Sequence, residues 1–240
     1  MIFPRLKIVC ARAPIQLWLR QVRRGVPRSV QPISRVFGYD RGQPIDRYYI
    51  EHFLGLNSAD IKGRVLEIGD SGYTTKFGGD RVKCSDVLHA VAGNPQATLV
   101  GDLATGDGIP KGAFDSIILT QTLPFIFDVK QAVSVIYAAL KPSGVALVTL
   151  PGISQISRYD MERWGDYWRF TDASVRRLFG DAFGAENVTQ TNYGNILAAC
   201  AFLQGLAAHE LKPAELDYRD PDYQVIIGVR VVRAVGDDGG

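Results

Sequence analysis

Short apolar runs alternate with amphipathic stretches along most of the chain. Runs rich in apolar and β-branched residues predict strands at residues 64–69, 82–86, 97–102, 114–120, 145–150, 187–191 and 223–232. Apolar residues at helical spacing predict helices at residues 46–54, 128–140, 171–179 and 196–208. Because strands that alternate with helices are joined by right-handed crossovers, the pattern predicts a doubly wound α/β fold with a mostly parallel, seven-stranded sheet.

The run from Phe114 to Thr120 is almost continuously apolar. Strands that are buried on both faces of a parallel sheet have this composition, so we expect this run to be the central strand. The helix that follows is expected to stop at Lys141-Pro142-Ser143-Gly144, because proline and glycine do not continue a helix. Thr171 is expected to cap the next helix.

The composition is that of a globular protein. The chain has 240 residues, of which 46% are hydrophobic and 22% are charged, so a full core can form and whole-chain disorder is excluded. Its three cysteines lie far apart and include no C-x-x-C pair, which argues against a disulfide scaffold or a zinc knuckle. Its three histidines include no i, i+4 pair, so we expect no metal site.

The charge is divided unevenly along the chain. Residues 1–35 carry eight Lys and Arg and no Asp or Glu, which leaves 19 basic and 25 acidic residues for 36–240. We therefore expect a basic N-terminal arm at 1–38, an α/β domain at 39–235 and a flexible tail at 236–240. The arm is expected to be solvated or to contact an anionic membrane surface or a phosphate-rich partner.

We expect no secretory signal in the first residues. Arg5, Lys7 and Arg12 interrupt the apolar run that such a signal needs, and no run is long enough to span a bilayer. We expect a cytoplasmic protein, with peripheral contact at the inner membrane face as the alternative.

Acidic residues and a glycine turn end the first three predicted strands. In an open parallel sheet the carboxyl ends of the strands hold the ligand, so Glu67, Gly69, Asp86 and Asp102 are expected to converge there. A dinucleotide fingerprint would need further glycines at Ser71 and Thr74, and Asp70 is electrostatically poor for a pyrophosphate. The turn therefore argues against NAD and favours a phosphate-free ligand with a cationic centre.

These residues resemble a known family, the class I S-adenosylmethionine-dependent methyltransferases, and within it the type 11 group. Residues 65–72 look like the first motif of the family, although Ser71 and Tyr73 stand at its second and third glycine places. The blocks 101–103, 114–123 and 140–145 also resemble family segments, and the similarity covers roughly residues 44–180. Pro124 stands where many type 11 members carry histidine.

The resemblance implies S-adenosylmethionine as the cofactor and indicates which residues hold it. Asp86, 19 residues after Glu67, would hold the ribose hydroxyls, and the Asp102 segment would contact the adenine amino group. Gln121 would lie near the methionine end. The implied cofactor-binding residues are Glu67, Gly69, Asp70, Ser71, Asp86, Asp102, Leu103 and Gln121.

The segment after the fifth strand is rich in aromatic and charged residues. One interpretation is an acceptor wall made of Arg158, Tyr159, Trp164, Tyr167, Trp168 and Arg169. The alternative is a lid in which Arg169 pairs with Asp166. Similar Tyr-Trp-Arg-Phe-Thr segments occur in type 11 members associated with polysaccharide or glycolipid assembly. This resemblance implies a carbohydrate, glycolipid or other small acceptor methylated at oxygen.

A hydroxyl acceptor needs a base, and the candidate catalytic residues are Asp160, Asp166 and His89. For His89, a place on the rim of the cofactor site or simple exposure is the alternative.

Two other functions stay open at this point. A homologue that keeps the nucleotide pocket without turnover is one, because of the departures in the first motif. A nucleic-acid methyltransferase is the other, although the acidic body and the lack of an Asn/Asp-Pro-Pro-aromatic motif make a nucleic-acid partner unlikely. The protein is expected to be a monomer or a homodimer that packs through small residues of 196–208.

Overall fold

The computed structural model describes residues 30–236. The chain divides into two compact units, Met1–Pro32 and Ile33–Gly240, and the fold below is that of the second unit. Residues 1–29 of the predicted basic arm lie outside the described residues, as do residues 237–240 of the predicted tail.

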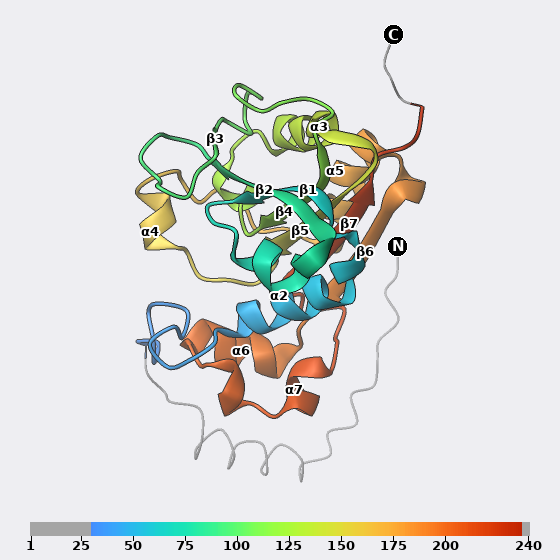
Figure 1. Cartoon of the computed structure of the whole chain (residues 1–240). Helices are drawn as coiled ribbons and strands as arrows, with labels where there is room; N and C mark the ends of the chain where they lie inside the picture. The colour runs from blue at the N-terminus through green and yellow to red at the C-terminus, as the bar shows by residue number, and fades with distance from the viewer. Residues whose placement is uncertain (1–29, 237–240) are drawn as a thin grey trace, which may run out of the picture. The chain divides into compact units, whose positions relative to one another are not determined.

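Seven strands form a single sheet, which confirms the predicted fold class (Figure 1). Their order is β3-β2-β1-β4-β5-β7-β6, so β4 is the central strand, as expected. β7 runs antiparallel to β5 and β6, and the other pairs of described strands are parallel. The strands are β1 (Gly63–Ile68), β2 (Val82–His89), β3 (Leu99–Val100), β4 (Phe114–Thr120), β5 (Leu140–Pro151), β6 (Val188–Tyr193) and β7 (Ile226–Val232).

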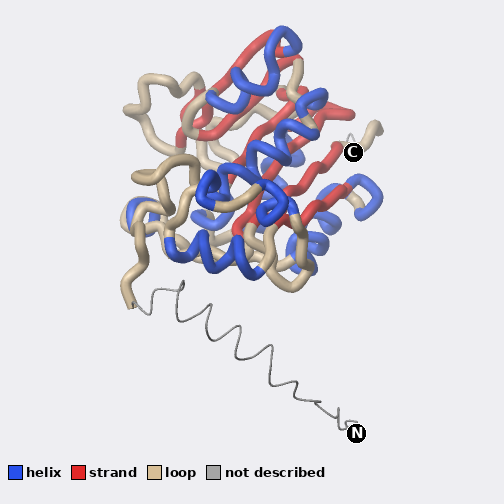
Figure 2. Tube along the Cα trace, turned by 90° about the horizontal axis from the view of Figure 1, so that it is seen from below, coloured by secondary structure: helices blue, strands red, loops and turns tan. Residues whose placement is uncertain are grey.

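Helices cover both faces of the sheet (Figure 2). On one face α3 (Val129–Ala139) and α5 (Asp172–Phe183) pack on side chains that include Leu66 and Leu119. On the other, α2 (Ile45–Leu56) and α6 (Ile196–Gln204) pack on side chains that include Val65 and Ile118. Neighbouring residues of one strand thus enter opposite cores, which explains the continuous apolar runs. Two shorter helices are α4 (Arg158–Met161) and α7 (Pro213–Asp217).

Side-chain caps set where the helices begin. The carboxylate of Asp128 accepts the N–H of Gln131 at 3.0 Å, and the hydroxyl of Thr171 accepts the N–H of Ser174 at 3.3 Å, so the predicted cap at Thr171 is confirmed. Such a cap stabilises a helix by about 1 kcal/mol. α6 ends at Gln204, earlier than predicted, because Gly205 adopts the left-handed conformation.

The five parallel strands, β1 to β5, end at one edge of the sheet, which we call the carboxyl edge. The register places Ile68 of β1 beside Leu88 of β2, and Thr120 of β4 beside Thr149 of β5. Ligands of open α/β sheets bind outside this edge.

Candidate functional site

Glu67 fixes the turn that follows β1. Its carboxylate is almost fully buried and accepts the backbone N–H groups of Tyr73 at 3.1 Å and of Thr74 at 2.7 Å. These donors begin the helical turn Thr74–Gly78. Burial raises the pKa of Glu67, although the two N–H groups oppose that shift. Glu67 therefore shapes the turn from inside.

Gly69 gives the turn an open side. Its φ is +88°, and a Cβ added there would meet no atom within 4 Å. Its carbonyl accepts Nδ2 of Asn94 at 2.7 Å, and its N–H donates to the carbonyl of Leu88 at 3.0 Å. The neighbouring Asp70 accepts the N–H of Gly72 at 2.7 Å, and the carbonyl of Ser71 accepts the N–H of Thr75 at 3.0 Å. The turn is thus held by its own hydrogen bonds and leaves open space outside Gly69.

Asp86 does not end its strand, so this prediction is wrong. β2 continues through Val87 and Leu88 to His89, and Asp86 lies beside Leu66 within the sheet. Its two oxygens accept Nε of Arg64 at 2.7 Å and the hydroxyl of Thr98 at 2.8 Å.

The partners of Asp86 explain how a carboxylate sits inside a strand. Burial alone would raise its pKa, but the bonds from Arg64 and Thr98 outweigh burial and lower it. Both oxygens of Asp86 thus have partners inside the fold, and its contact with the ribose hydroxyls stays a prediction.

His89 and Trp164 meet above the end of β2. Their ring centroids lie 6.0 Å apart at an interplanar angle of 77°. His89 comes from the carboxyl edge and Trp164 from the segment after α4. The contact joins two residues that the sequence had assigned to different parts of the site.

The segment after β3 carries the other predicted nucleoside residues. Asp102 is exposed, and its carboxylate accepts the N–H of Ala104 at 2.7 Å. Its own N–H donates to the carbonyl of Asp107 at 2.9 Å, which turns the chain away after only two residues of β3. Leu103 is buried in the core. Asp102 therefore stays available at the edge, whereas Leu103 anchors the loop.

Gln121 follows β4 with an unusual backbone. Its φ is +51°, which non-glycine residues rarely adopt. Its N–H donates to the carbonyl of Thr149 at 2.9 Å, and its Nε2 lies 3.4 Å from the Thr149 hydroxyl. This bridge to β5 holds the amide at the carboxyl edge, where such strain is often found at functional positions.

Arg47 and Asp46, which the sequence analysis missed, lie near the turn after β1. Nη1 of Arg47 is buried without a hydrogen-bond partner among the described residues, while Nε donates to the hydroxyl of Tyr39 at 2.8 Å. Arg47 interacts electrostatically with Tyr73, and burial raises the pKa of Tyr73 to about 12. Burial also raises the pKa of Asp46. Nη1 lies 3.9 Å from Oδ2 of Asp46, so it has an ion-pair partner but no hydrogen bond among the described residues. A buried guanidinium N–H without a hydrogen bond, near an open turn, fits a carboxylate ligand.

Asp166 and Arg169 hold the segment after β5, which matches the lid interpretation. Nη1 and Nη2 of Arg169 lie 2.6 and 3.0 Å from the two oxygens of Asp166. Nη2 also donates to the carbonyl of Gln155 at 2.6 Å. Burial would raise the pKa of Asp166, but Arg169 and the N–H of Ser157 lower it. A carboxylate held in this way is a poor base, and Arg169 is occupied within the segment.

Asp160 lies on the short helix α4 in a different environment. One oxygen accepts the hydroxyl of Ser157 at 2.6 Å, and the side chain is partly exposed. Arg158, at the start of the same helix, is exposed. Asp160 is thus a predicted base that the fold leaves partly accessible from outside.

Three exposed aromatic side chains form a cluster that we call the aromatic platform. Phe127 lies with its ring centroid 5.4 Å from that of Tyr167 and 5.7 Å from that of Trp168. Nε1 of Trp168 donates to the carbonyls of Ile126 and Phe127, which fixes the indole. Phe127, which the sequence analysis missed, is 69% exposed. Tyr159 is separate and packs under the guanidinium of Arg163.

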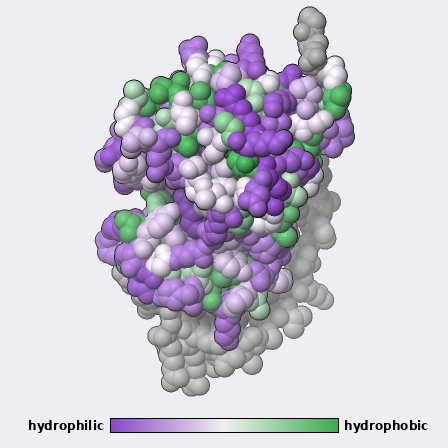
Figure 3. Space-filling view, viewed as in Figure 1, coloured by the Kyte–Doolittle hydropathy of each residue, from purple (hydrophilic) through white to green (hydrophobic). Residues whose placement is uncertain are grey.

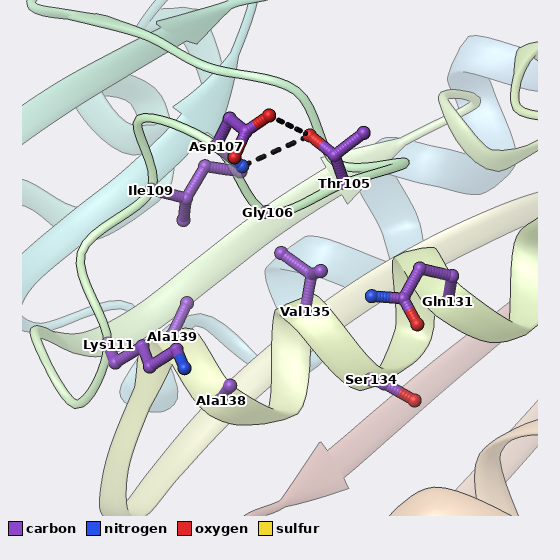
Figure 4. Close-up of a pocket in the computed structure, with 10 residues that line it drawn as sticks. All are labelled: Thr105, Gly106, Asp107, Ile109, Lys111, Gln131, Ser134, Val135, Ala138 and Ala139. Carbon is purple, nitrogen blue, oxygen red and sulfur yellow. Dashed lines mark hydrogen bonds between the residues drawn. The ribbon is translucent and has the colours of Figure 1, made fainter.

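The surface is indented on the side where α4 lies (Figure 3). A second hollow, of about 330 Å³, lies apart from the carboxyl edge, between α3 and the loop 105–111 (Figure 4). Thr105 and Asp107 are bonded to each other on its rim. This hollow contains none of the predicted site residues.

The described residues hold neither a metal site nor a membrane-spanning helix. Within residues 30–236, no three His, Cys, Asp or Glu side chains are grouped so that they could hold a metal ion. No helix in the described part of the chain has the length and apolar character needed to cross a membrane.

Comparison with known proteins identifies the fold. No family model matches the chain, and no curated protein matches its sequence. The solved structure of a SAM-dependent methyltransferase from Archaeoglobus fulgidus superposes with a TM-score of 0.51 at 10% identity, covering 78% of this chain and 94% of that chain. The [4+2]-cyclase SpnF superposes with a TM-score of 0.53 at 15% identity, covering 92% of this chain and 93% of that chain.

These likenesses concern the fold, since one of the two structures is named for a different reaction. The assignment to the type 11 group stays a prediction. Together with the strand order, the comparisons show that this chain has the fold of the class I S-adenosylmethionine-dependent methyltransferases.

Proposed function

We propose that this protein is an S-adenosylmethionine-dependent methyltransferase whose cofactor lies along the carboxyl edge. The observation that carries the proposal is the open turn at Gly69 together with Nη1 of Arg47, which interacts with Tyr73 of the same turn and has no hydrogen-bond partner among the described residues. A guanidinium pairs well with an amino-acid carboxylate, and the turn lacks the glycine-rich cradle that a pyrophosphate needs. Both features suit a nucleoside joined to an amino acid without a phosphate.

Different residues along the carboxyl edge can bind different parts of such a ligand. Arg47 would bind its carboxylate, Gly69 would let it approach the backbone, and Asp102 would contact its base. The cofactor supplies an activated methyl group on a sulfonium. The protein then has to orient the acceptor and exclude water.

We propose Asp160 as the group that takes the proton of a hydroxyl acceptor. Its bond from Ser157 orients the carboxylate, and its partial exposure leaves it accessible. Asp166, bound to Arg169 at both oxygens, instead keeps the segment in place. Replacement of Asp160 by Asn should therefore lower the turnover number and leave the melting temperature almost unchanged.

The aromatic platform supports a carbohydrate or glycolipid acceptor methylated at oxygen. Tyr167 and Trp168 offer flat apolar surfaces with polar tips, the kind of contact that sugar rings use. Phe127 extends this surface and has no evident structural reason for its 69% exposure. Phe127→Ala should raise the KM for such an acceptor and leave cofactor affinity unchanged.

Binding of the cofactor is tested by titration calorimetry with S-adenosylmethionine, S-adenosylhomocysteine and NAD. We expect micromolar binding of the first two and none of NAD. Gly69→Ala should abolish binding, because its Cβ would occupy the open space outside the turn.

Gly79→Ala is the matched control. Gly79 also has a positive φ, +55°, and open space around it, but it ends the helical turn instead of facing the edge. Both variants carry the same kind of strain, about 1–2 kcal/mol. Equal loss of binding in both, or no binding by the folded wild type, would overturn the proposal. Binding without methyl transfer to any glycan or lipid-linked acceptor would favour the non-catalytic alternative.

A further inference from the structure

The end of β2 carries a histidine where this kind of fold uses a carboxylate. In doubly wound nucleotide-binding folds an Asp or Glu about 20 residues after the first glycine of the turn binds a ribose hydroxyl. His89 follows Gly69 by 20 residues and is the last residue of β2. Asp86, the only carboxylate of that strand, is held by Arg64 and Thr98. The strand thus presents an imidazole at the sugar position.

The hydrogen bonds of His89 decide which nitrogen is an acceptor. Nδ1 lies 2.8 Å from the carbonyl oxygen of Val91, and a carbonyl can only accept, so Nδ1 carries the proton. The N–H of Val91 lies farther from Nδ1, at 3.4 Å, and would need the opposite tautomer. We therefore assign the tautomer from the shorter contact, the one with the carbonyl of Val91. The tautomer with its proton on Nδ1 leaves Nε2 as an acceptor, which is what a hydroxyl donor requires.

Trp164 gives this position a cover. Its indole meets the imidazole edge to face at 6.0 Å and is 37% exposed. The backbone N–H of Trp164 donates to the carbonyl of Asp160 at 2.7 Å, and the segment is held by the Asp166–Arg169 pair. The indole is therefore placed beside the sugar position by a fixed segment.

We infer that His89 accepts a ribose hydroxyl through Nε2 and that Trp164 covers the same sugar, so that the site selects a ligand with an intact ribose. This inference rests on the proposed function and assigns one contact within it. A hydrogen bond of this kind changes affinity by about 2- to 12-fold.

The test compares S-adenosylhomocysteine with its 2′-deoxy and 3′-deoxy derivatives by calorimetry. In the wild type, removal of one of the two hydroxyls should weaken binding by about 2- to 12-fold. In His89→Ala the same removal should have no effect, because the acceptor is already gone. His89→Asp restores a carboxylate and should bind S-adenosylhomocysteine at least as tightly as the wild type. Trp164→Ala should weaken the binding of all three ligands by a similar factor.

His52→Ala is the matched control, since His52 is also partly exposed and also contacts aromatic rings, those of Tyr48 and Tyr193. It should preserve both the affinity and the hydroxyl effect. A hydroxyl effect that persists in His89→Ala would overturn the inference alone. Failure of the wild type to bind S-adenosylhomocysteine would overturn the proposed function, and the inference with it. Melting curves of each variant separate loss of contact from loss of fold.

Discussion

The carboxylate of Asp166 meets the guanidinium of Arg169 at two points, with separations of 2.6 and 3.0 Å. The Asp166 side chain is 1% exposed, whereas that of Arg169 is 27% exposed. The same guanidinium reaches the carbonyl of Gln155, so the pair joins both ends of the segment after β5. The segment that carries Asp160 and Trp164 is therefore fixed by one ion pair, and its variants should reveal how far the site depends on it.

Asp166→Asn should destabilise the protein by about 1.5–3 kcal/mol, the range for hydrogen bonds to charged groups. Because its folded pKa is lowered, the contribution of Asp166 is complete above its unfolded pKa of about 4 and is lost as the pH falls through the folded value. Urea unfolding at pH 7 and pH 3 should thus show a smaller acid effect in the variant than in the wild type.

Asp181→Asn provides the control for this pair. Asp181 faces Arg177 at 3.9 Å, and their side chains are 50% and 85% exposed. Because solvent screens exposed ion pairs, they contribute little to stability, so the free energy of unfolding should change by no more than about 0.5 kcal/mol. A similar loss in both variants would show that Asp166 contributes no more than a surface charge.

Gly165→Ala should loosen the aromatic platform. Gly165 has a φ of +91°, and an added Cβ would lie 2.2 Å from the ring of Tyr167. The clash should cost about 1–3 kcal/mol beyond the strain of the left-handed backbone. Tyr167 has to move, so the near-ultraviolet circular dichroism of the platform should change.

Gly112→Ala separates the clash from the strain. Gly112 also has a positive φ, +58°, but a Cβ there meets nothing within 4 Å. Gly112→Ala should lower the free energy of unfolding by about 1–2 kcal/mol without any change in the near-ultraviolet circular dichroism. If the two variants are equally stable, Tyr167 is not confined by Gly165.

The strained backbone of Gln121 predicts a trade between stability and activity. Gln121→Gly relieves about 1–2 kcal/mol of left-handed strain and loses about 0.5–1 kcal/mol to the more flexible unfolded chain, for a net gain of about 0.5 kcal/mol. The same gain is expected for Ser143→Gly, whose φ is +62°. Only Gln121→Gly should lose methyl transfer, because Ser143 lies at the other end of β5. Thermal melts and turnover of both variants check this, and equal activity would remove Gln121 from the site.

Much of the fold could be predicted because its signals are local. The run Phe114–Thr120 is buried on both faces, and its composition alone marks it as the central strand. Thr171 caps α5 through a bond that spans three residues. Glu67 was also found by its place before the glycine turn, since its partners lie within seven residues.

The errors arose where distant partners decide the outcome. Asp86 looks like the end of a strand, but Arg64 and Thr98, 22 and 12 residues away, neutralise it inside the sheet. Arg47 could not be recognised, because its place beside Tyr73 exists only after α2 packs near the turn. Phe127 looks like an ordinary core residue until the fold leaves it exposed beside Trp168. Sequence periodicity indicates which face of an element is apolar, but it does not tell which apolar residue stays uncovered.

Arg47 offers the sharpest separation of the two ends of the proposed cofactor. Arg47→Met keeps the apolar stem but removes the charge. It should therefore weaken the binding of S-adenosylhomocysteine by about 10- to 150-fold, the range for a hydrogen bond to a charged group. It should leave 5′-methylthioadenosine unchanged, because that ligand has no amino-acid carboxylate.

Arg230→Met controls for the loss of a partly buried arginine. Arg230 pairs with Asp60, just before β1, at 2.8 Å, away from the carboxyl edge. It should lower stability and leave both affinities unchanged. If Arg47→Met weakens the two ligands equally, the guanidinium supports the fold of the turn and does not bind the carboxylate. If only the binding of S-adenosylhomocysteine is affected, the guanidinium of Arg47, whose Nη1 has no hydrogen-bond partner in the described part of the chain, is the group that recognises the amino-acid end.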